Sequence, residues 1–373
     1  MNTPVKLPFY AKTSIIFLGL LAFISMLYVG QKIIVPIIYS TVIAIVLSPM
    51  VNFLTHFRVN KILAITITLV VAIAFVLAVV AFLCTQGARL SDSLPVLREK
   101  ITLLTEQAVS WVSQTFKISE NRLNEWLNDL RSEVSDSSGS ALGKTLIYTG
   151  NFLVILILIP VYIFMILFYQ PLLLEFVHRL FRTQKQGEVR EVLTAIKRII
   201  QNYLVGLLIE AFLIASMNSI SLLIIGIDYA ILLGVIGAIV NIIPYIGGIL
   251  GVSLPFLLAL ATKPSVTNAL FVLVAYMIIQ FIDNHYIVPK IVASKVKINA
   301  LVSIVVVLAG SALWGIPGML LSIPLTAIIK VICDHIVGLE PWGFLLGDTM
   351  PGEIPVRMKI RRRFFRSKMA HQK

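Results

Sequence analysis

The chain has 373 residues, of which 58% are hydrophobic and 13% are charged, and its formal net charge is +13. Soluble globular domains are nearer half apolar and a quarter charged, so this composition excludes an ordinary soluble domain and predicts a membrane protein. The two cysteines, Cys84 and Cys333, lie in apolar sequence, which argues against a disulfide scaffold or a zinc site. We expect neither a metal nor a cofactor.

The positive charge is concentrated at the end of the sequence. Residues 356–373 contain eight Lys or Arg residues and no acid. A basic tail of this kind marks the cytoplasmic side of a membrane protein and contacts anionic lipid. No nucleic-acid-binding motif accompanies it, so we expect no nucleic-acid partner.

Charge-free runs predict four membrane spans in the first half of the chain, because a helix needs about 20 apolar residues to cross a bilayer. The first run is longer than the apolar region of a signal peptide and lacks a clear cleavage site, so we expect it to be a retained span. The four runs are 13–31, 33–55, 62–88 and 145–174.

A polar insert, residues 87–144, separates the third and fourth spans. Its first part carries apolar residues at alternating spacings of four and three, and a second apolar stripe follows. Two interpretations stay open: a helical hairpin that packs on itself, or a contact between subunits of a homo-oligomer. The stripes are Leu90, Leu94, Leu97, Ile101, Leu104, Ala108 and Trp111, then Leu123, Trp126, Leu127, Leu130 and Val134.

The loops predict the orientation of the spans. The loop 170–198 has six Lys or Arg against three acids, whereas the insert has seven against eight. The excess of positive charge places the loop in the cytoplasm and the insert outside. Both termini are then cytoplasmic, in a cell inner membrane.

Two further spans, 199–226 and 264–288, alternate in the second half with two runs that are too long for one crossing. The run 229–262 has 34 residues without a charge, so a straight helix would be about 50 Å long against a bilayer core of about 30 Å. Breaks at Pro244–Gly248 and at residues 310–318 predict two re-entrant hairpins; the alternative is two tilted full crossings. The predicted fold is an all-α polytopic membrane protein with about six full transmembrane helices.

Each half of this region is a helix followed by a hairpin, and the two halves enter from opposite sides. That order predicts an inverted repeat, which in secondary transporters places the substrate site near the bilayer midplane. We therefore expect five parts: three spans (1–86), an extracytoplasmic insert (87–144), a span with a basic loop (145–198), a transport core (199–333) and a basic tail (334–373).

Several polar residues are predicted to lie at membrane depth. Glu210 follows Arg198 by 12 residues, which is about 18 Å along a helix, and Asn218 lies on nearly the same face. A carboxylate at that depth is costly unless it is protonated, paired or hydrated. The alternative role of Glu210 is a hydrogen bond that locks two helices together.

The seventh helix carries a second polar face, which contains Tyr276, Gln280, Asp283 and Asn284. The alternative for Asp283 is an interfacial residue or helix-end partner. Asn241, at the first hairpin tip, has the alternative of satisfying its own broken backbone.

The hairpin tips supply polar groups of another kind. Irregular backbone is tolerated at membrane depth only where protein or a water-filled cavity surrounds it. We therefore expect both tips to bring free amides and carbonyls to one cavity from opposite sides, where they bind a small polar solute or an ion.

Three segments resemble the autoinducer-two exporter family of bacterial permeases: residues 226–251, 280–291 and 308–330, with "NIIPYIG" as the most specific piece. The order of spans and the insert match as well. Two departures are Asp283, where the family often has Glu, and the lack of a proline near Asn299. Carried over by motif, the candidate residues are Asn241, Pro244, Gly247 and Gly248, then Gln280, Asp283 and Asn284, then Gly315, Pro317 and Gly318.

The resemblance implies transport and leaves the substrate open, since members are associated with export of a quorum-sensing furanone or with sodium– or lithium–proton antiport. Our leading hypothesis is a secondary transporter that exports a small polar solute. The alternative is a monovalent cation/proton antiporter with Glu210 and Asp283 as carriers. An intramembrane enzyme and a membrane scaffold are further alternatives, but no catalytic constellation or ATP-binding loop is present.

Overall fold

The computed structural model describes residues 8–91, 94–116, 119, 121–122, 125, 157–180, 186–243, 247–263 and 265–349. Over these residues the chain is helical, with no strand, and the predicted all-α polytopic membrane fold is confirmed. Six helical stretches are long and apolar enough to cross a membrane by length and composition. They are α1 (Phe9–Val29), α2 (Gln31–His56), α3 (Lys61–Ser91), α8 (Gln186–Ile225), α11 (Val266–Ile282) with its continuation, and α13 (Ala300–His335).

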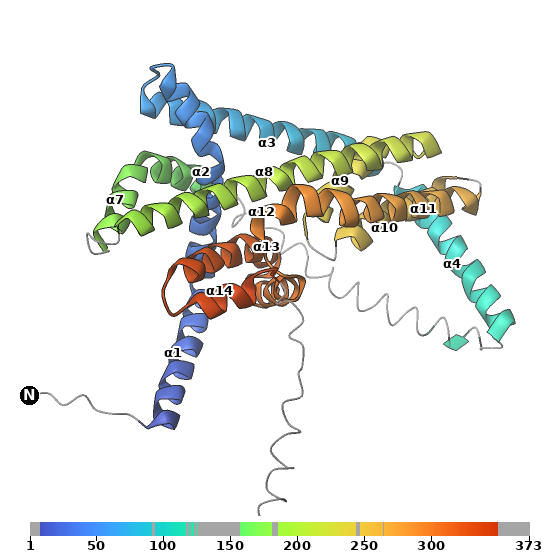
Figure 1. Cartoon of the computed structure of the whole chain (residues 1–373). Helices are drawn as coiled ribbons and strands as arrows, with labels where there is room; N and C mark the ends of the chain where they lie inside the picture. Colours follow the sequence, from blue (N-terminus) through green and yellow to red (C-terminus); the bar gives the residue numbers. More distant parts are fainter. Residues whose placement is uncertain are drawn as a thin grey trace, which may run out of the picture.

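The long helices α8 and α11 pack side by side, and α1 and α2 cross them at a steep angle (Figure 1). A proline inside α2 ties it to α8. Pro49 has no backbone N–H, so the carbonyl of Ile45 lacks its helical donor. The side chain of Gln201 on α8 donates to that oxygen at 2.7 Å.

The fourth predicted span is bent. Its described part, Ile157–Phe168, turns by 63° into α7 (Gln170–Leu180). The run to Leu174 is therefore not one straight helix, and the extent of the span stays a prediction. Pro171 lies in the first turn of α7, where its missing N–H has no helical partner to lose, so it favours a new helix start after Tyr169.

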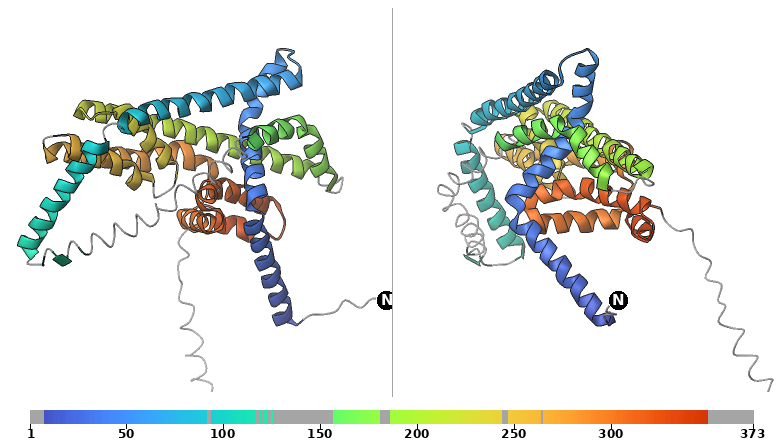
Figure 2. Two further views of the ribbon diagram at one scale, coloured as in Figure 1. Left: turned by 180° about the vertical axis from the view of Figure 1, so that it is seen from behind. Right: turned by 90° about the vertical axis from the view of Figure 1, so that its left-hand side faces the viewer.

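The insert begins with a helix, as its first apolar stripe predicts. This helix, α4 (Leu94–Phe116), extends away from the bundle (Figures 1 and 2). The second stripe, Leu123 to Val134, falls almost entirely outside the described residues, and no described contact distinguishes a self-packed hairpin from a subunit contact.

The first predicted hairpin is present as two helices, α9 (Ala230–Asn241) and α10 (Gly247–Thr262). The helix before it, α8, ends at Gly226, whose φ of 78° is a conformation that glycine adopts without strain. The two arms touch through glycines, because a Cβ on Gly237 would lie 3.5 Å from the carbonyl oxygen of Gly251. Pro255 deprives that carbonyl of its helical donor.

The seventh predicted span is not a regular helix to its end. After α11 the chain continues as a π-helix, η2 (Asp283–Ala293), and a short α12 (Ser294–Val296). The wider π turn is often found at functional sites. Gly206 of α8 allows this segment to come close, since a Cβ there would lie 2.7 Å from the carbonyl oxygen of Ile291.

The second predicted break occurs inside α13. Gly315 has φ 64° and ψ −143°, which no helix contains. A Cβ on Gly318 would collide with the carbonyl oxygen of Gly310, so the chain folds back and the two arms lie side by side (Figure 2). This helical hairpin contradicts a single tilted crossing for this run. The side of the bilayer from which either hairpin enters stays a prediction.

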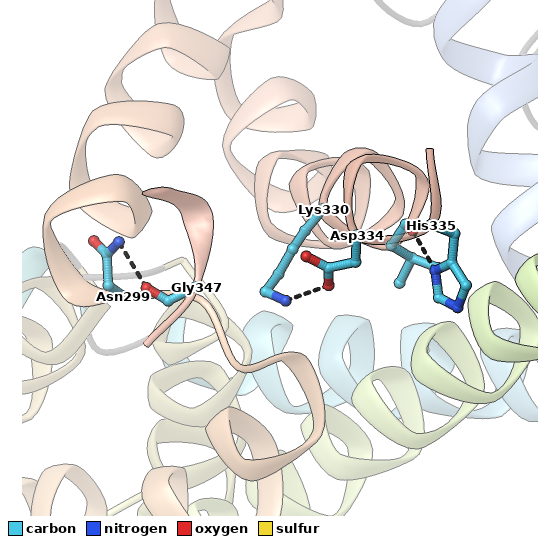
Figure 3. A network of polar contacts seen from close by, with 6 residues as sticks. Asn299, Lys330, Asp334, His335 and Gly347 are labelled. Carbon is cyan, nitrogen blue, oxygen red and sulfur yellow. Dashed lines mark hydrogen bonds and ion pairs between the residues drawn. The ribbon is translucent and has the colours of Figure 1, made fainter. Parts of the chain in front are cut away.

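The base of the second hairpin is held by the C-terminal helix α14 (Glu340–Leu346). The Asn299 amide donates to the carbonyl oxygen of Gly347 at 3.0 Å (Figure 3) and to that of Leu345 at 2.7 Å. Its oxygen caps α13 by accepting from the N–H of Val302. Asn299 thus sets the start of α13.

Candidate functional site

A cavity of about 840 Å³ lies between α8, the first hairpin, α11 with η2, and the base of the second hairpin. Apolar side chains such as Leu207, Ile249 and Val252 form part of its wall. Its polar lining comes from helices that are far apart in the sequence, and six of the predicted site residues meet there: Glu210, Asn241, Gly248, Gln280, Asp283 and Asn284.

The cavity contains two buried carboxyl groups. Glu210 is 7% exposed and Asp283 is 1% exposed, and the two are close enough to interact electrostatically. Within the described residues neither has a basic partner. Two unpaired charges in such a place are costly, so the cavity must supply water, protons or a cationic or hydrogen-bonding ligand.

Asp283 is held by the tip of the first hairpin. Its Oδ2 accepts a hydrogen bond of 2.9 Å from the side chain of Asn241, while its Oδ1 is buried with no partner among the described residues. Asp283 is therefore buried inside the protein, at the position where α11 ends, and its depth in the membrane stays a prediction. Among the described residues, the side-chain hydrogen bond of Asn241 goes to this carboxyl group; whether its side chain also bonds to the break at residues 244–246 lies outside the described residues.

The alternative for Glu210, a helix-locking hydrogen bond, has no support in the structure. Over the described residues its side chain makes no hydrogen bond or ion pair. It faces the cavity from α8, across from Asp283 at the start of the π-helix. An unbonded carboxyl group at a cavity wall is available to a proton or a ligand.

Gln280 and Asn284 form the second polar face, with a hydrogen bond of 3.3 Å from the Gln280 amide to the Asn284 oxygen. The first hairpin makes room for this pair. A Cβ on Gly248 would collide with the side-chain oxygen of Gln280. Gly248 is therefore required by the close approach of a polar side chain.

Tyr203, Tyr276 and Ser303 also line the cavity, although the sequence analysis did not select them as site residues. Tyr276 lies on the predicted polar face of α11, four residues before Gln280. Tyr203 lies two turns before Glu210 on α8, so helical spacing identifies it in retrospect. Ser303 had no sequence signal, because it reaches the cavity through the fold of the second hairpin.

Asn218 lies outside the cavity. It is 3% exposed, and its Oδ1 has no partner among the described residues. At the tip of the first hairpin, Gly247 is buried against the backbone of Val240 and Asn241. Pro244, the other predicted residue there, lies outside the described residues.

The second hairpin tip does not reach the cavity, so the expectation that both tips meet there is wrong. The carbonyl oxygen of Pro317 accepts a hydrogen bond of 3.0 Å from Tyr39 of α2, and the Trp314 indole donates to Leu27 of α1 at 3.1 Å. Trp314 and Pro317 thus anchor the hairpin to the first two helices, whereas Gly315 forms the turn and Gly318 packs against Gly310 of the other arm. Its base lines the cavity instead, through residues such as Ser303.

A multi-pass helical fold around a cavity with apolar walls and a few convergent polar groups is the architecture of a membrane transport protein. The chain matches the family model described as AI-2E family transporter over residues 16–338, and it belongs to that family. The resemblance noted in the sequence is therefore confirmed.

The relatives are transport proteins by their descriptions. The chain is 26% identical over 342 residues to "AI-2 transport protein TqsA" of Escherichia coli, which covers 90% of this chain and 95% of that protein. It is 25% identical over 336 residues to "Putative transport protein YueF" of Bacillus subtilis, which covers 88% and 89% of the two chains. The family consists of transport proteins, which points away from an enzyme.

Proposed function

We propose that the protein is a secondary transporter that exports a small polar solute through the cavity between α8, the first hairpin and η2. The relative described as an AI-2 transport protein favours a signalling metabolite of this class as cargo. A cavity of about 840 Å³ with apolar walls and a few convergent polar groups suits a small polar molecule.

The observation that carries this proposal is the pair of buried carboxyl groups, Glu210 and Asp283, in one cavity without a basic partner. An empty cavity leaves their charge poorly compensated, and a proton or the donor groups of a solute compensate it. Binding and a change of protonation are thereby coupled, which is what gradient-driven transport needs.

Alternating access requires an element whose position the solute biases. We assign that part to residues 199–333, which hold both hairpins, and treat the first four spans with the insert as the frame. The anchoring of the second tip on α1 and α2 supports a hinge there, since the same hairpin also lines the cavity at its base.

A second candidate function is antiport of a monovalent cation against protons. The unpartnered Oδ1 of Asp283, beside the amide of Asn241, favours it, because a carboxylate oxygen with free lone pairs is a ligand for a hard cation. Glu210 then carries the proton.

Transport in proteoliposomes under separately imposed proton and sodium gradients tests both candidates. If a proton is coupled through Glu210, Glu210→Gln abolishes gradient-driven accumulation and leaves solute exchange largely intact, since Gln keeps the shape but cannot titrate. Asp283→Asn acts alike if Asp283 is the ion ligand. Unchanged gradient-driven transport in Glu210→Gln contradicts proton coupling through Glu210 and favours facilitated export.

We further propose an inner-membrane location with both termini in the cytoplasm, contact of the basic tail with anionic lipid, and a homo-oligomer formed through the insert. The loop charges support the first two proposals. The helix α4 supports the proposed homo-oligomer, because it projects from the bundle.

A further inference from the structure

A second cavity, of about 380 Å³, is lined by residues of the first half of the chain, whereas residues of the second half line the transport cavity. It is formed by the end of α2, the start of α3 and the corner at Gln170 where the fourth span bends into α7. Its polar lining consists of Ser48, Asn52, Thr55, Lys61 and Gln170.

A buried hydroxyl group in this cavity lacks a partner. Ser48 is 3% exposed, and its Oγ has no hydrogen-bond partner among the described residues. A buried hydroxyl usually bonds to a protein group or to a bound molecule. Ser48 lines the cavity, so a molecule bound there is the partner it lacks.

The charge around the cavity is positive. Lys61 lines it, and residues 1–91 contain no Asp or Glu. The ammonium group of Lys61 donates to the carbonyl oxygen of Phe168 at 2.9 Å and keeps two further protons to donate. Lys61 also begins α3, whose N-terminal end attracts anions.

The adjoining helices indicate the depth of the cavity in the membrane. α7 leaves the fourth span at 63° and combines exposed leucines with an ion pair between Glu175 and Arg179. Such a helix lies along the membrane interface at the level of the headgroups. On the other side, α3 exposes Leu63, Ile67 and Val70, a surface suited to acyl chains.

We propose that this cavity is a binding site for a phosphate-bearing anion, with Ser48 and Lys61 as donors, and that an anionic phospholipid headgroup supplies the phosphate. Asn52 and Gln170 add neutral donors around it, while the hydroxyl proton of Thr55 is already donated to the carbonyl oxygen of Asn52. The site joins α2, α3 and the fourth span at one corner, so the bound lipid stabilises the helices that we assign to the frame.

Native mass spectrometry of the detergent-purified full chain, with added phosphatidylglycerol or diacylglycerol, tests the proposal. We expect retention of phosphatidylglycerol and little retention of diacylglycerol, which lacks the phosphate. Lys61→Gln should weaken phosphatidylglycerol binding about tenfold, the effect of losing one charge-assisted hydrogen bond. Arg58→Gln is the matched control. It removes a positive charge three residues before Lys61, and Arg58 is not among the described residues that line the cavity.

Equal weakening by Lys61→Gln and Arg58→Gln, or equal retention of the two lipids, overturns the site. Ser48→Ala keeps the test informative if Lys61→Gln disturbs folding. It should weaken binding if the hydroxyl donates to the phosphate, whereas unchanged binding with a raised melting temperature means a dry cavity and also overturns it. Competition by millimolar inorganic phosphate assigns the site to a soluble anion, and its absence to the lipid.

Discussion

At the residue scale, the cavity depends on close approaches that larger side chains would prevent. Gly248 lies against the side chain of Gln280, which in turn donates to Asn284. From the other arm of the first hairpin, Asn241 donates to one oxygen of Asp283, and the other oxygen has no partner among the described residues. The cavity lining therefore depends on the absence of a side chain at Gly248 and on the amide group of Asn241.

We predict that Gly248→Leu blocks both gradient-driven transport and solute exchange, because the new side chain displaces Gln280 and fills the cavity wall. Gly19→Leu is the control, since Gly19 lies on α1 with no atom within 4 Å of its missing Cβ. Radiolabelled solute counterflow in proteoliposomes measures the difference. Retained exchange in Gly248→Leu would show that the pathway does not pass the first hairpin tip.

At the element scale, helix-breaking residues create contacts between helices. Pro49 frees the carbonyl of Ile45, and Gln201 fills the vacancy from α8. Pro255 similarly frees the carbonyl of Gly251, which lies against Gly237 of the other hairpin arm. At Pro49 another helix thus supplies the missing hydrogen bond, and at Pro255 the freed carbonyl lies at a close approach of the two hairpin arms.

We predict that Gln201→Leu lowers the free energy of unfolding by about 1 kcal/mol, the scale of hydrogen bonds between membrane helices. In a Pro49→Ala background the same change should cost less, because the restored backbone N–H pairs with the carbonyl of Ile45. Unfolding of all four proteins in mixed detergent micelles measures this coupling. An equal cost in both backgrounds would mean that the Gln201 bond does not depend on the proline.

At the scale of the whole molecule, the second hairpin connects the cavity to the first two helices. Its base contributes Ser303 to the cavity, and its tip bonds to Tyr39. Asn299 fixes the base to the C-terminal helix. This hairpin is therefore held at both ends.

The proposed topology predicts that single cysteines at Ser294 and Ser367 label only from the cytoplasmic side, and one at Ser137 only from outside. The native Cys84 and Cys333 are replaced first in the background protein. Ser294 is exposed at the start of α12 and so is accessible to a reagent. Labelling of position 294 from outside, with an impermeant maleimide on intact cells, would contradict the two-hairpin topology.

Local chemistry allowed much of the fold to be predicted. Charge-free runs located α1, α2 and α3 within a few residues, because transfer of apolar side chains into lipid depends on composition alone. Glycines and prolines likewise indicated both hairpin breaks, since they restrict the backbone wherever they occur. The cavity-facing carboxyl groups were also predictable, because a charge inside an apolar run is costly without a functional reason.

Contacts between distant segments were beyond such reasoning. Packing between helices decides three features of the structure. They are the contact of Asn241 with Asp283, the placement of the tip at Pro317 against α2 rather than the cavity, and the point where α11 widens into a π-helix. Hydropathy and backbone preference act over a few neighbouring residues, whereas these contacts join segments 42 to 278 residues apart. The sequence by itself thus determined which segments are helical and which residues are costly to bury, and the tertiary structure decided which of them share one cavity, because only close packing selects among alternative partners of similar local energy.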